Sequence, residues 1–432
     1  MPISQTSGEW AAQDGISFSM DSIESFNDAA DKFMASLDAS VKIIALGEAL
    51  HGGEGFLMLR NKLFQRLVDV HGFSAIAIES SFPKGHFVNE YVNGRGSDAY
   101  DSIKEKGFSH GCGQLEANRE LVEWMRQYNA DSSHITKLLF YGIDSPTEMT
   151  GTDSPRQVLL FVLDYLYNLI DDGSGKARRE RIEALIGPDP DWENPYAMMD
   201  ASRSIGLSDY ATSLRIETED LITELKVRRP ELIKASNKDR YMEAVHYASV
   251  ARQLLNYHAE MAGNSDKRTS NLLGIRDAMI ADNLVYAVSR EQNRGKVLVF
   301  AHNQHLKKSN VQWDLGPNHI EWTPAGAHLC SLFGPQYVII GAGLGISEDN
   351  GIGEPECGTL ESLLTNKIES AMFIPTKKVY GLLNSEISHL PTRSGSSRNG
   401  SYFPFTSESL IDFDWLAILK STGYTRGALP LT

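Results

Sequence analysis

The first apolar run of the chain reads Val41-Lys42-Ile43-Ile44-Ala45-Leu46-Gly47-Glu48, and His51 follows shortly after it. A short run rich in Val and Ile is typical of a strand that is buried on both faces of a parallel sheet. From Gly52 an apolar stripe at helical spacing continues to Gly72, where a helix is expected to end. A second apolar run at 73–79 completes a β-α-β unit, so the two strands should be parallel with a right-handed crossover.

Three further apolar runs also end in ionisable residues. Residues 75–78 run into Glu79, residues 138–143 into Asp144, and residues 297–301 into His302, with His305 three positions later. In an open α/β sheet, ligands bind beyond the carboxyl ends of the strands. Four strand ends that carry two Glu, one Asp and one His therefore predict one acid–base site assembled from distant parts of the sequence.

The pattern of strands and helices divides the chain into three parts. Residues 1–154 form the N-terminal half of an α/β core, and residues 267–432 form its C-terminal half, with strands at 296–302 and 336–343. Residues 155–266 show helical spacing without a central strand. We expect an α/β fold with a mostly parallel central sheet flanked by helices, and a helical insertion that forms a lid or wall over the active-site cleft. A separate second domain is the alternative for 155–266.

Composition excludes several classes of protein. The 432 residues are 41% hydrophobic and carry a net charge of -15, which disfavours non-specific binding to nucleic acid. The three cysteines (Cys112, Cys330 and Cys357) are too scattered for a disulfide framework or a metal motif. Residues 1–20 lack the apolar core of a signal peptide, and no apolar run reaches the ~18 residues of a membrane span. These features predict a cytoplasmic protein without a membrane partner.

The strongest chemical candidate is the pair Glu48 and His51 at a strand-to-helix junction. Free N–H groups at a helix start favour an anion, and His has a suitable pKa for a general base at neutral pH. Glu48 or Glu79 would raise that pKa and select one tautomer. The alternative is a structural role, in which His51 only caps the helix or fills a polar pocket.

His302 and His305 form an HxxH pair just beyond a strand. This spacing is compatible with a metal site, but it also arises by chance. For Glu79 and Asp144 the alternative is a buried salt bridge with Arg276 or Arg60. No GxSxG, Walker, GxGxxG or HExxH motif is present, and the glycines of 341–345 do not match the dinucleotide fingerprint, so no cofactor is expected.

Six segments resemble, in order along the chain, motifs of the erythromycin esterase family. The first segment contains a GExxH-like motif and is followed by Arg60. The six segments are 46–52, 76–79, 141–146, 276–282, 300–308 and 324–329. The resemblance implies hydrolysis of a macrolide lactone or a similar ester, without a covalent serine or a metal. The implied partner is a small hydrophobic substrate.

The resemblance also implies roles for individual residues. His51 would be the general base that activates water, and Glu48 and Glu79 would orient it. His302 and His305 would complete the catalytic set by positioning the substrate or stabilising an oxyanion. The implied substrate-binding residues are Arg60, Asp144, Arg276 and His328.

Two departures from the family pattern leave the substrate open. Gly52-Gly53 stand where macrolide esterases tend to carry a bulkier apolar residue, and Ala325 stands where the family often has Met. The same acid–base groups would suit a natural-product tailoring enzyme that hydrolyses amides, cyclises or epimerises. They would also suit a hydrolase that binds Zn²⁺ or Mn²⁺ through the five catalytic candidates, or a protein that binds a small molecule without catalysis.

Overall fold

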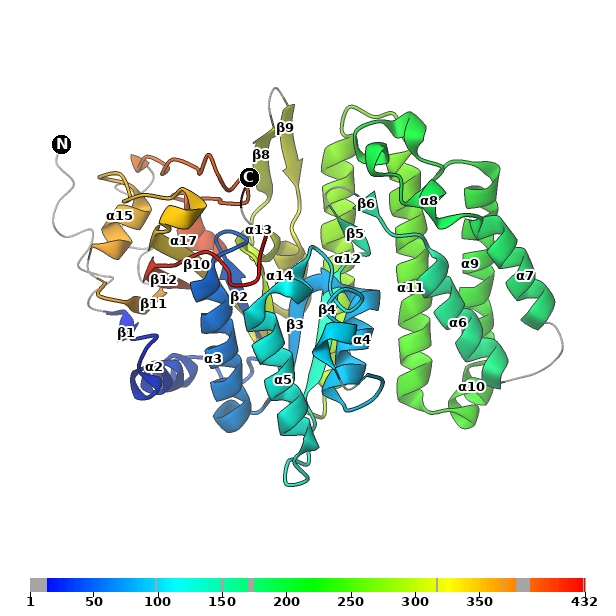
Figure 1. The fold of residues 1–432 in the computed structure, drawn as a ribbon, viewed down its shortest axis with the longest axis horizontal. Coiled ribbons are helices and arrows are strands. Elements are labelled where there is room, and N and C mark those ends of the chain that lie inside the picture. Colours follow the sequence, from blue (N-terminus) through cyan, green and yellow to red (C-terminus); the bar gives the residue numbers. More distant parts are fainter. Residues whose placement is uncertain are drawn as a thin grey trace.

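An eight-stranded sheet organises the protein, in the order β1-β11-β12-β10-β2-β7-β3-β4 (Figure 1). The structure is a computed structural model, and it describes residues 14–97, 99–148, 151–169, 175–315, 318–366, 368–377, 389–429 and 431. The strands are β1 (Ile16–Phe18), β2 (Ile43–Glu48), β3 (Phe73–Ser81), β4 (Leu139–Asp144), β7 (Lys296–His302), β10 (Tyr337–Ile346), β11 (Ala371–Pro375) and β12 (Trp415–Ser421).

Most of this sheet is parallel. All neighbouring pairs from β12 to β4 are parallel, whereas β11 runs antiparallel to β12, and β1 antiparallel to β11. This confirms the α/β fold with a mostly parallel sheet. The two strands of the predicted β-α-β unit, β2 and β3, are not neighbours, because β7 lies between them and pairs with both.

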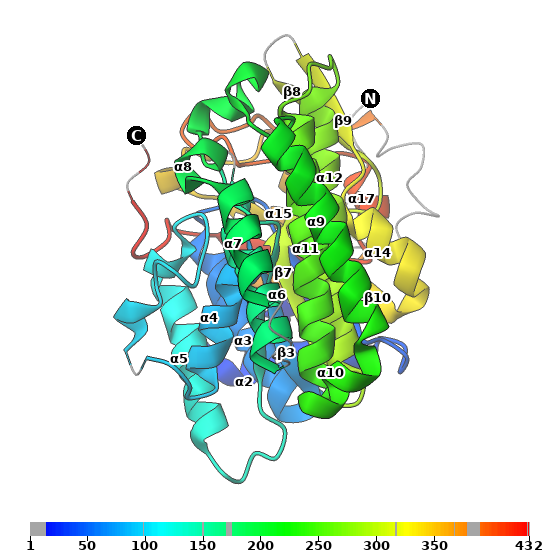
Figure 2. The same cartoon turned by 90° about the vertical axis from the view of Figure 1, so that its right-hand side faces the viewer.

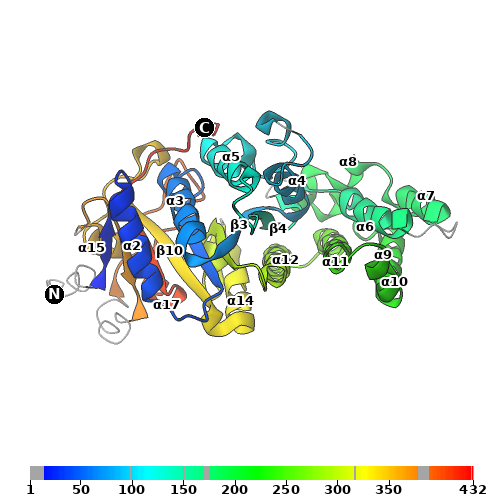
Figure 3. The same ribbon diagram turned by 90° about the horizontal axis from the view of Figure 1, so that it is seen from below.

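Side chains from both faces of the sheet are buried in two separate cores. Along β2, Ile43 and Ala45 belong to one core, and Ile44 and Leu46 to the other. Such two-sided burial is why this strand reads as a continuous apolar run. One face is covered by α2 (Ile23–Ala35), α3 (Glu54–His71), α4 (Phe82–Val92) and α5 (Glu116–Ala130), and the other by α12 (Arg268–Glu291), α14 (Ala325–Phe333), α15 (Leu360–Thr365) and α17 (Ser409–Asp412) (Figure 3).

A group of helices lies beyond the β4 edge of the sheet (Figures 1 and 2). Its long helix α11 packs on α12, and α12 in turn contacts β4. The group comprises α6 (Arg156–Leu169), α7 (Gly175–Ile186), α8 (Asp189–Trp192), α9 (Asp209–Val227), α10 (Arg229–Ala235) and α11 (Lys238–Met261). The helical content expected for 155–266 is therefore present, while the division of the chain into 1–154, 155–266 and 267–432 stays a prediction.

Two small antiparallel sheets and one short helix complete the fold. β5 (Thr147–Glu148) pairs with β6 (Gly151–Thr152), and β8 (Val311–Leu315) pairs with β9 (Asn318–Trp322) as a hairpin that rises beside the main sheet (Figure 1). The helix α13 (Asn303–Leu306) directly follows β7. Within the described ranges, no helix is both long and apolar enough to cross a membrane.

Candidate active site

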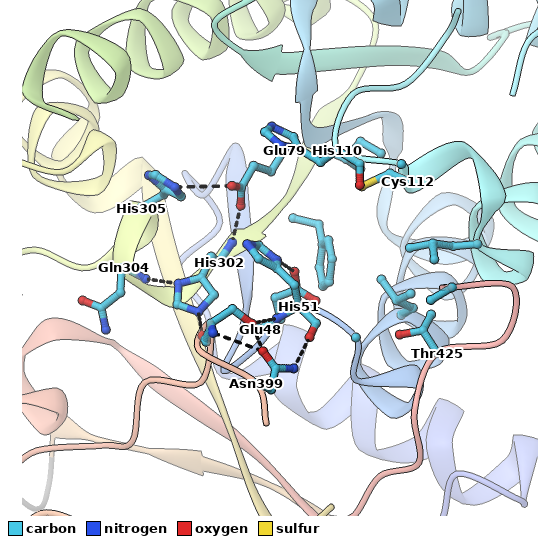
Figure 4. Close-up of a pocket in the computed structure, with 18 of the residues that line it drawn as sticks. Glu48, His51, Glu79, His110, Cys112, His302, Gln304, His305, Asn399 and Thr425 are labelled. Carbon is cyan, nitrogen blue, oxygen red and sulfur yellow. Dashed lines mark hydrogen bonds and ion pairs between the residues drawn. The ribbon is translucent and has the colours of Figure 1, made fainter. Parts of the chain in front are cut away.

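A pocket of about 630 Å³ opens at the carboxyl edge of the sheet. The sheet order places β2, β7, β3 and β4 side by side, so their charged ends meet there. Figure 4 shows Glu48, His302 and Glu79 converging from the ends of β2, β7 and β3. The polar lining of the pocket includes Glu48, His51, Arg60, Glu79, Arg276, His302 and His305.

His51 is held by both its side chain and its backbone. Its Nδ1 lies 2.7 Å from Oε1 of Glu48, the last residue of β2. The backbone N–H of His51 donates to Oγ of Ser401 at 2.9 Å, and its carbonyl accepts from Nδ2 of Asn399 at 2.8 Å. Desolvation disfavours the imidazolium, but the hydrogen bond to Glu48 and the charges of Glu48 and Glu79 outweigh it and raise the pKa of His51.

Glu79 lies near the end of β3 and joins three partners. Its Oε1 accepts from Nη2 of Arg276 at 3.1 Å and lies 3.3 Å from Nε2 of His305. Its Oε2 accepts from the backbone N–H of His302 at 2.7 Å. Burial would raise the pKa of Glu79, but these cations lower it well below the usual range of a carboxyl group. Glu79 is therefore a carboxylate at neutral pH.

His302, the last residue of β7, has both ring nitrogens engaged. Its Nδ1 accepts from the backbone N–H of Gln304 at 3.2 Å, so Nε2 carries the proton and donates to the carbonyl of Ser401 at 3.0 Å. Burial, together with the nearby charge of His51, lowers the pKa of His302 to about 3. This imidazole is neutral and has no free lone pair with which to accept a proton.

His305 has the opposite charge state from His302, although both belong to one HxxH motif. Its Nδ1 donates to Oδ1 of the fully buried Asp277 at 2.8 Å. Burial disfavours the imidazolium, but Asp277 and Glu79 raise the pKa of His305 to about 10. Asp277 also accepts from the indole of Trp322 at 2.6 Å and from the backbone N–H of Ala325 at 2.9 Å. His305 is therefore a cation at neutral pH. Through Asp277 it is linked to Trp322 of the β8–β9 hairpin and to Ala325 at the start of α14.

Asp144, at the end of β4, lies behind the pocket and does not line it. Its carboxylate accepts from Nε of Arg276 at 2.9 Å and from Nη2 at 2.7 Å, and it lies 3.0 Å from Nε2 of His110. Burial opposes ionisation, but Arg276 and His110 lower the pKa of Asp144 to about 2. Asp144 therefore does not face the pocket as a substrate contact, and the salt bridge with Arg276, the alternative for this residue, is present.

Arg60 lines the pocket although its side chain is almost fully buried. Its guanidinium donates to the side-chain oxygens of Asn61 and Asn118 and lies 4.9 Å from the ring centre of Phe300. Among the described residues, no carboxylate lies within ion-pair distance of it. Burial accordingly lowers its pKa to about 10, which leaves it charged at neutral pH.

Two sequence expectations about the surroundings of the site are wrong. The described part of 155–266 contributes no residue to the lining of this pocket, because those helices pack against α12 at the β4 edge. The walls instead come from the β8–β9 hairpin, the segment 110–118, the loop at 399–403, and Tyr424, Thr425, Ala428, Leu429 and Leu431. His328 does not line the pocket either, because α14 starts at the carboxyl edge and runs away from it toward the start of the parallel strand β10.

Sequence reasoning missed four residues that shape the site. His110 lies in the left-handed region at φ 55°, which is unusual for a residue other than glycine. Asn399 and Ser401 hold the backbone of His51 from 348 and 350 positions away. Tyr424 lines the pocket from the C-terminal part of the chain. The only local signals are glycines beside these residues, which mark turns but carry no information about what the turns contact.

The ring nitrogens of two candidate metal ligands, His302 and His305, already have hydrogen-bond partners. Both nitrogens of His302 are engaged, and His305 binds Asp277 and Glu79. Within the ranges that the structure describes, no group of three His, Cys, Asp or Glu side chains is arranged to hold a metal ion. The five catalytic candidates therefore do not fit a Zn²⁺ or Mn²⁺ site.

Comparison with known proteins assigns the family. Residues 68–422 match the family model described as erythromycin esterase. The chain belongs to the erythromycin esterase family. This confirms the family that the sequence motifs suggested. The matched range starts after Glu48 and His51, so the assignment of those two residues rests on their geometry.

Two relatives of the erythromycin esterase family come from Escherichia coli. The chain is 24% identical over 347 residues to erythromycin esterase type II, covering 77% of this chain and 76% of that protein. It is 22% identical over 313 residues to erythromycin esterase type I, covering 69% of each chain.

Solved structures show the same fold at low sequence identity. A Bacillus cereus protein matches with a TM-score of 0.76 at 17% identity, over 98% of this chain and 99% of that chain. A succinoglycan biosynthesis protein matches with a TM-score of 0.72 at 18% identity, over 99% of this chain and 100% of that chain. A mutant of the erythromycin esterase EreC in its open conformation matches with a TM-score of 0.65 at 18% identity, over 94% of this chain and 96% of that chain.

Proposed function

We propose that this erythromycin esterase family member hydrolyses an ester of a small, largely apolar molecule, with a macrolide lactone as the leading candidate. The observation that carries the proposal is the Glu48–His51 pair in the pocket. Because the Nδ1–H of His51 donates a hydrogen bond to the carboxylate of Glu48, the lone pair of the neutral His51 ring is on Nε2, to which no described residue bonds. This is the arrangement that a general base for water requires.

Four histidines line the pocket beside Glu79 and Glu48: His51, His110, His302 and His305. Nε2 of His110 lies 3.0 Å from Oδ2 of Asp144, the carboxylate behind the pocket. His302 is neutral with both nitrogens bonded, and His305 is a fixed imidazolium. His51 combines a carboxylate partner at Nδ1 with an Nε2 to which no described residue bonds, and it is therefore the base that we propose. Environments that separate the pKa values of neighbouring groups in this way are typical of acid–base assignments in enzymes.

The reaction follows from these charge states. Water attacks the ester carbonyl carbon while Nε2 of His51 takes its proton, and the carbonyl oxygen becomes an oxyanion. The positive charges of Arg60, Arg276 and His305 stabilise that oxyanion at close range. The intermediate then expels the alkoxide, which takes the proton back from His51. In a lactone the acid and the alcohol remain in one opened molecule.

The test compares His51→Ala with wild type on erythromycin and on p-nitrophenyl esters. We expect kcat to fall by about 10²- to 10⁴-fold, the usual contribution of a general base. His328→Ala is the matched control, because His328 is partly exposed and lies outside the pocket, and its kcat should change less than about twofold.

Mass spectrometry of the product separates hydrolysis from the other candidate activities. Ester hydrolysis adds one water to the substrate, whereas epimerisation leaves its mass unchanged. If His51→Ala keeps the kcat of wild type, or if the substrate is bound without any product, the proposed function is wrong.

A further inference from the structure

Residues 423–427 are docked onto the loop that carries His51. The backbone N–H of Glu54 donates to the carbonyl of Gly423, that of Thr425 donates to the carbonyl of Gly52, and Tyr424 forms a β-bridge with Gly53. A Cβ atom on Gly52 would lie 2.8 Å from the ring of Tyr424, and Gly52 has a φ of 91°. Gly52 therefore leaves the space that the ring of Tyr424 fills.

Arg426 fixes this segment to two helices at once. Its Nε donates to Oε1 of Glu54 on α3 at 2.6 Å, and its Nη1 donates to Oε1 of Glu120 on α5 at 3.1 Å. Its carbonyl accepts from the backbone N–H of Glu116 at 3.1 Å. Gly427 follows in the left-handed region, where a Cβ atom would lie 2.1 Å from a backbone oxygen of Gln114. The segment thus has one defined path along the pocket.

Apolar side chains on both sides of Arg426 line the pocket. Tyr424, Ala428, Leu429 and Leu431 all belong to the lining, and we call these four residues the 424–431 wall. Leu429 is 85% exposed and Leu431 is 37% exposed. Leucines that border a pocket and remain open to solvent gain free energy when an apolar ligand covers them. Trp313 and Trp322 of the β8–β9 hairpin line the same pocket.

We propose that the 424–431 wall is a specificity-determining element, which binds the aliphatic part of the ester while His51 acts on its carbonyl. This inference rests on the proposed function, and it adds the class of substrate: esters with an extended aliphatic surface beside the scissile bond. The wall acts on binding, so its removal changes KM and leaves the chemistry of short esters intact. A side chain at position 52 would clash with the ring of Tyr424. The glycines at 52 and 53, where macrolide esterases tend to carry a bulkier apolar residue, therefore leave space for this wall.

The test compares Leu429→Ser with wild type on p-nitrophenyl octanoate and p-nitrophenyl acetate. We expect kcat/KM for the octanoate to fall about five- to tenfold through KM, and the values for the acetate to stay within about twofold. Leu332→Ser is the matched control, since Leu332 is a 63% exposed leucine on α14 outside the pocket. It should leave both esters unchanged.

A binding titration keeps this test separate from the esterase activity. If wild type hydrolyses neither of these esters and does not hydrolyse erythromycin, the proposed function fails, and the wall is measured by the affinity for 8-anilinonaphthalene-1-sulfonate. In the same variants that affinity should weaken at least about threefold in Leu429→Ser and stay constant in Leu332→Ser. Equal changes in the two variants, or no change in Leu429→Ser, would overturn the inference in either measurement.

Discussion

The strand-end wall, formed by the ends of β2, β7 and β3 with Asp144 of β4 behind them, differs from the 424–431 wall in what holds each in place. The strand ends carry charged side chains that are buried and bonded to one another, such as Glu79 and Asp144 around Arg276. The 424–431 wall is apolar and exposed, and its anchor is the half-exposed Arg426. In the strand-end wall, charged groups of the site also stabilise the fold. The side chains of the 424–431 wall, in contrast, can be replaced with little loss of unfolding free energy.

The largest expected effect on folding is at the strand ends. Asp144→Asn leaves the guanidinium of the buried Arg276 with Glu79 as its remaining carboxylate. Breaking a buried ion pair on one side typically costs about 3 to 5 kcal/mol of unfolding free energy. Urea unfolding monitored by circular dichroism measures it. A loss below about 1 kcal/mol would mean that the ends of the strands are not the stabilised part of the pocket.

His305 should give a smaller, pH-dependent effect. Its pKa is raised to about 10 in the folded protein, so its stabilisation is complete below its ordinary pKa of 6.5 and is lost as pH rises toward about 10. We expect a loss of roughly 2 kcal/mol between about pH 7 and about pH 9. In the His305→Gln variant, the unfolding free energy measured with urea should not show this loss between about pH 7 and about pH 9. An equal alkaline loss in both proteins would assign it to other groups.

Arg426→Ala should have the smallest effect on folding. Its two ion pairs join side chains of which two are about half exposed, and such pairs contribute at most about 1 kcal/mol. Urea unfolding of this variant checks the expectation directly. A loss as large as that of Asp144→Asn would erase the distinction between the two walls.

The two walls also differ in how well the sequence predicts them. Glu48, Glu79, Asp144 and His302 each end an apolar run, so local patterning finds the strand and the parallel fold places their ends together. The pairing of Arg276 with Asp144 was predictable for the same reason, because a buried charge needs a partner.

The 424–431 wall has no comparable local signal. Tyr424 contacts Gly52, which is 372 positions away in the sequence. No sequence pattern around either residue predicts this contact. Long-range contacts of loops depend on the whole fold. The same holds for the helices of 155–266: their amphipathic spacing predicts helices but not the neighbour that their apolar faces cover, which is α12 and not the pocket.

The charge states within the HxxH motif could not be predicted from spacing either. His302 and His305 are three residues apart, yet one has its pKa lowered to about 3 and the other raised to about 10. The pKa of His305 is raised largely by Asp277, which lies on another helix and bonds the ring of His305 but not that of His302. Sequence placed both histidines at the site and left their roles open.

The pH dependence of turnover tests the central claim, that Glu48 and His51 form the base at the strand-end wall. Because the pKa of His51 is raised and the base must be unprotonated, kcat/KM should rise with pH through a midpoint above 6.5. Glu48→Gln removes the charge that raises this pKa, so its midpoint should move to lower pH and its rate should fall. The same midpoint in both proteins, or a rate that does not fall in acid, would contradict the account.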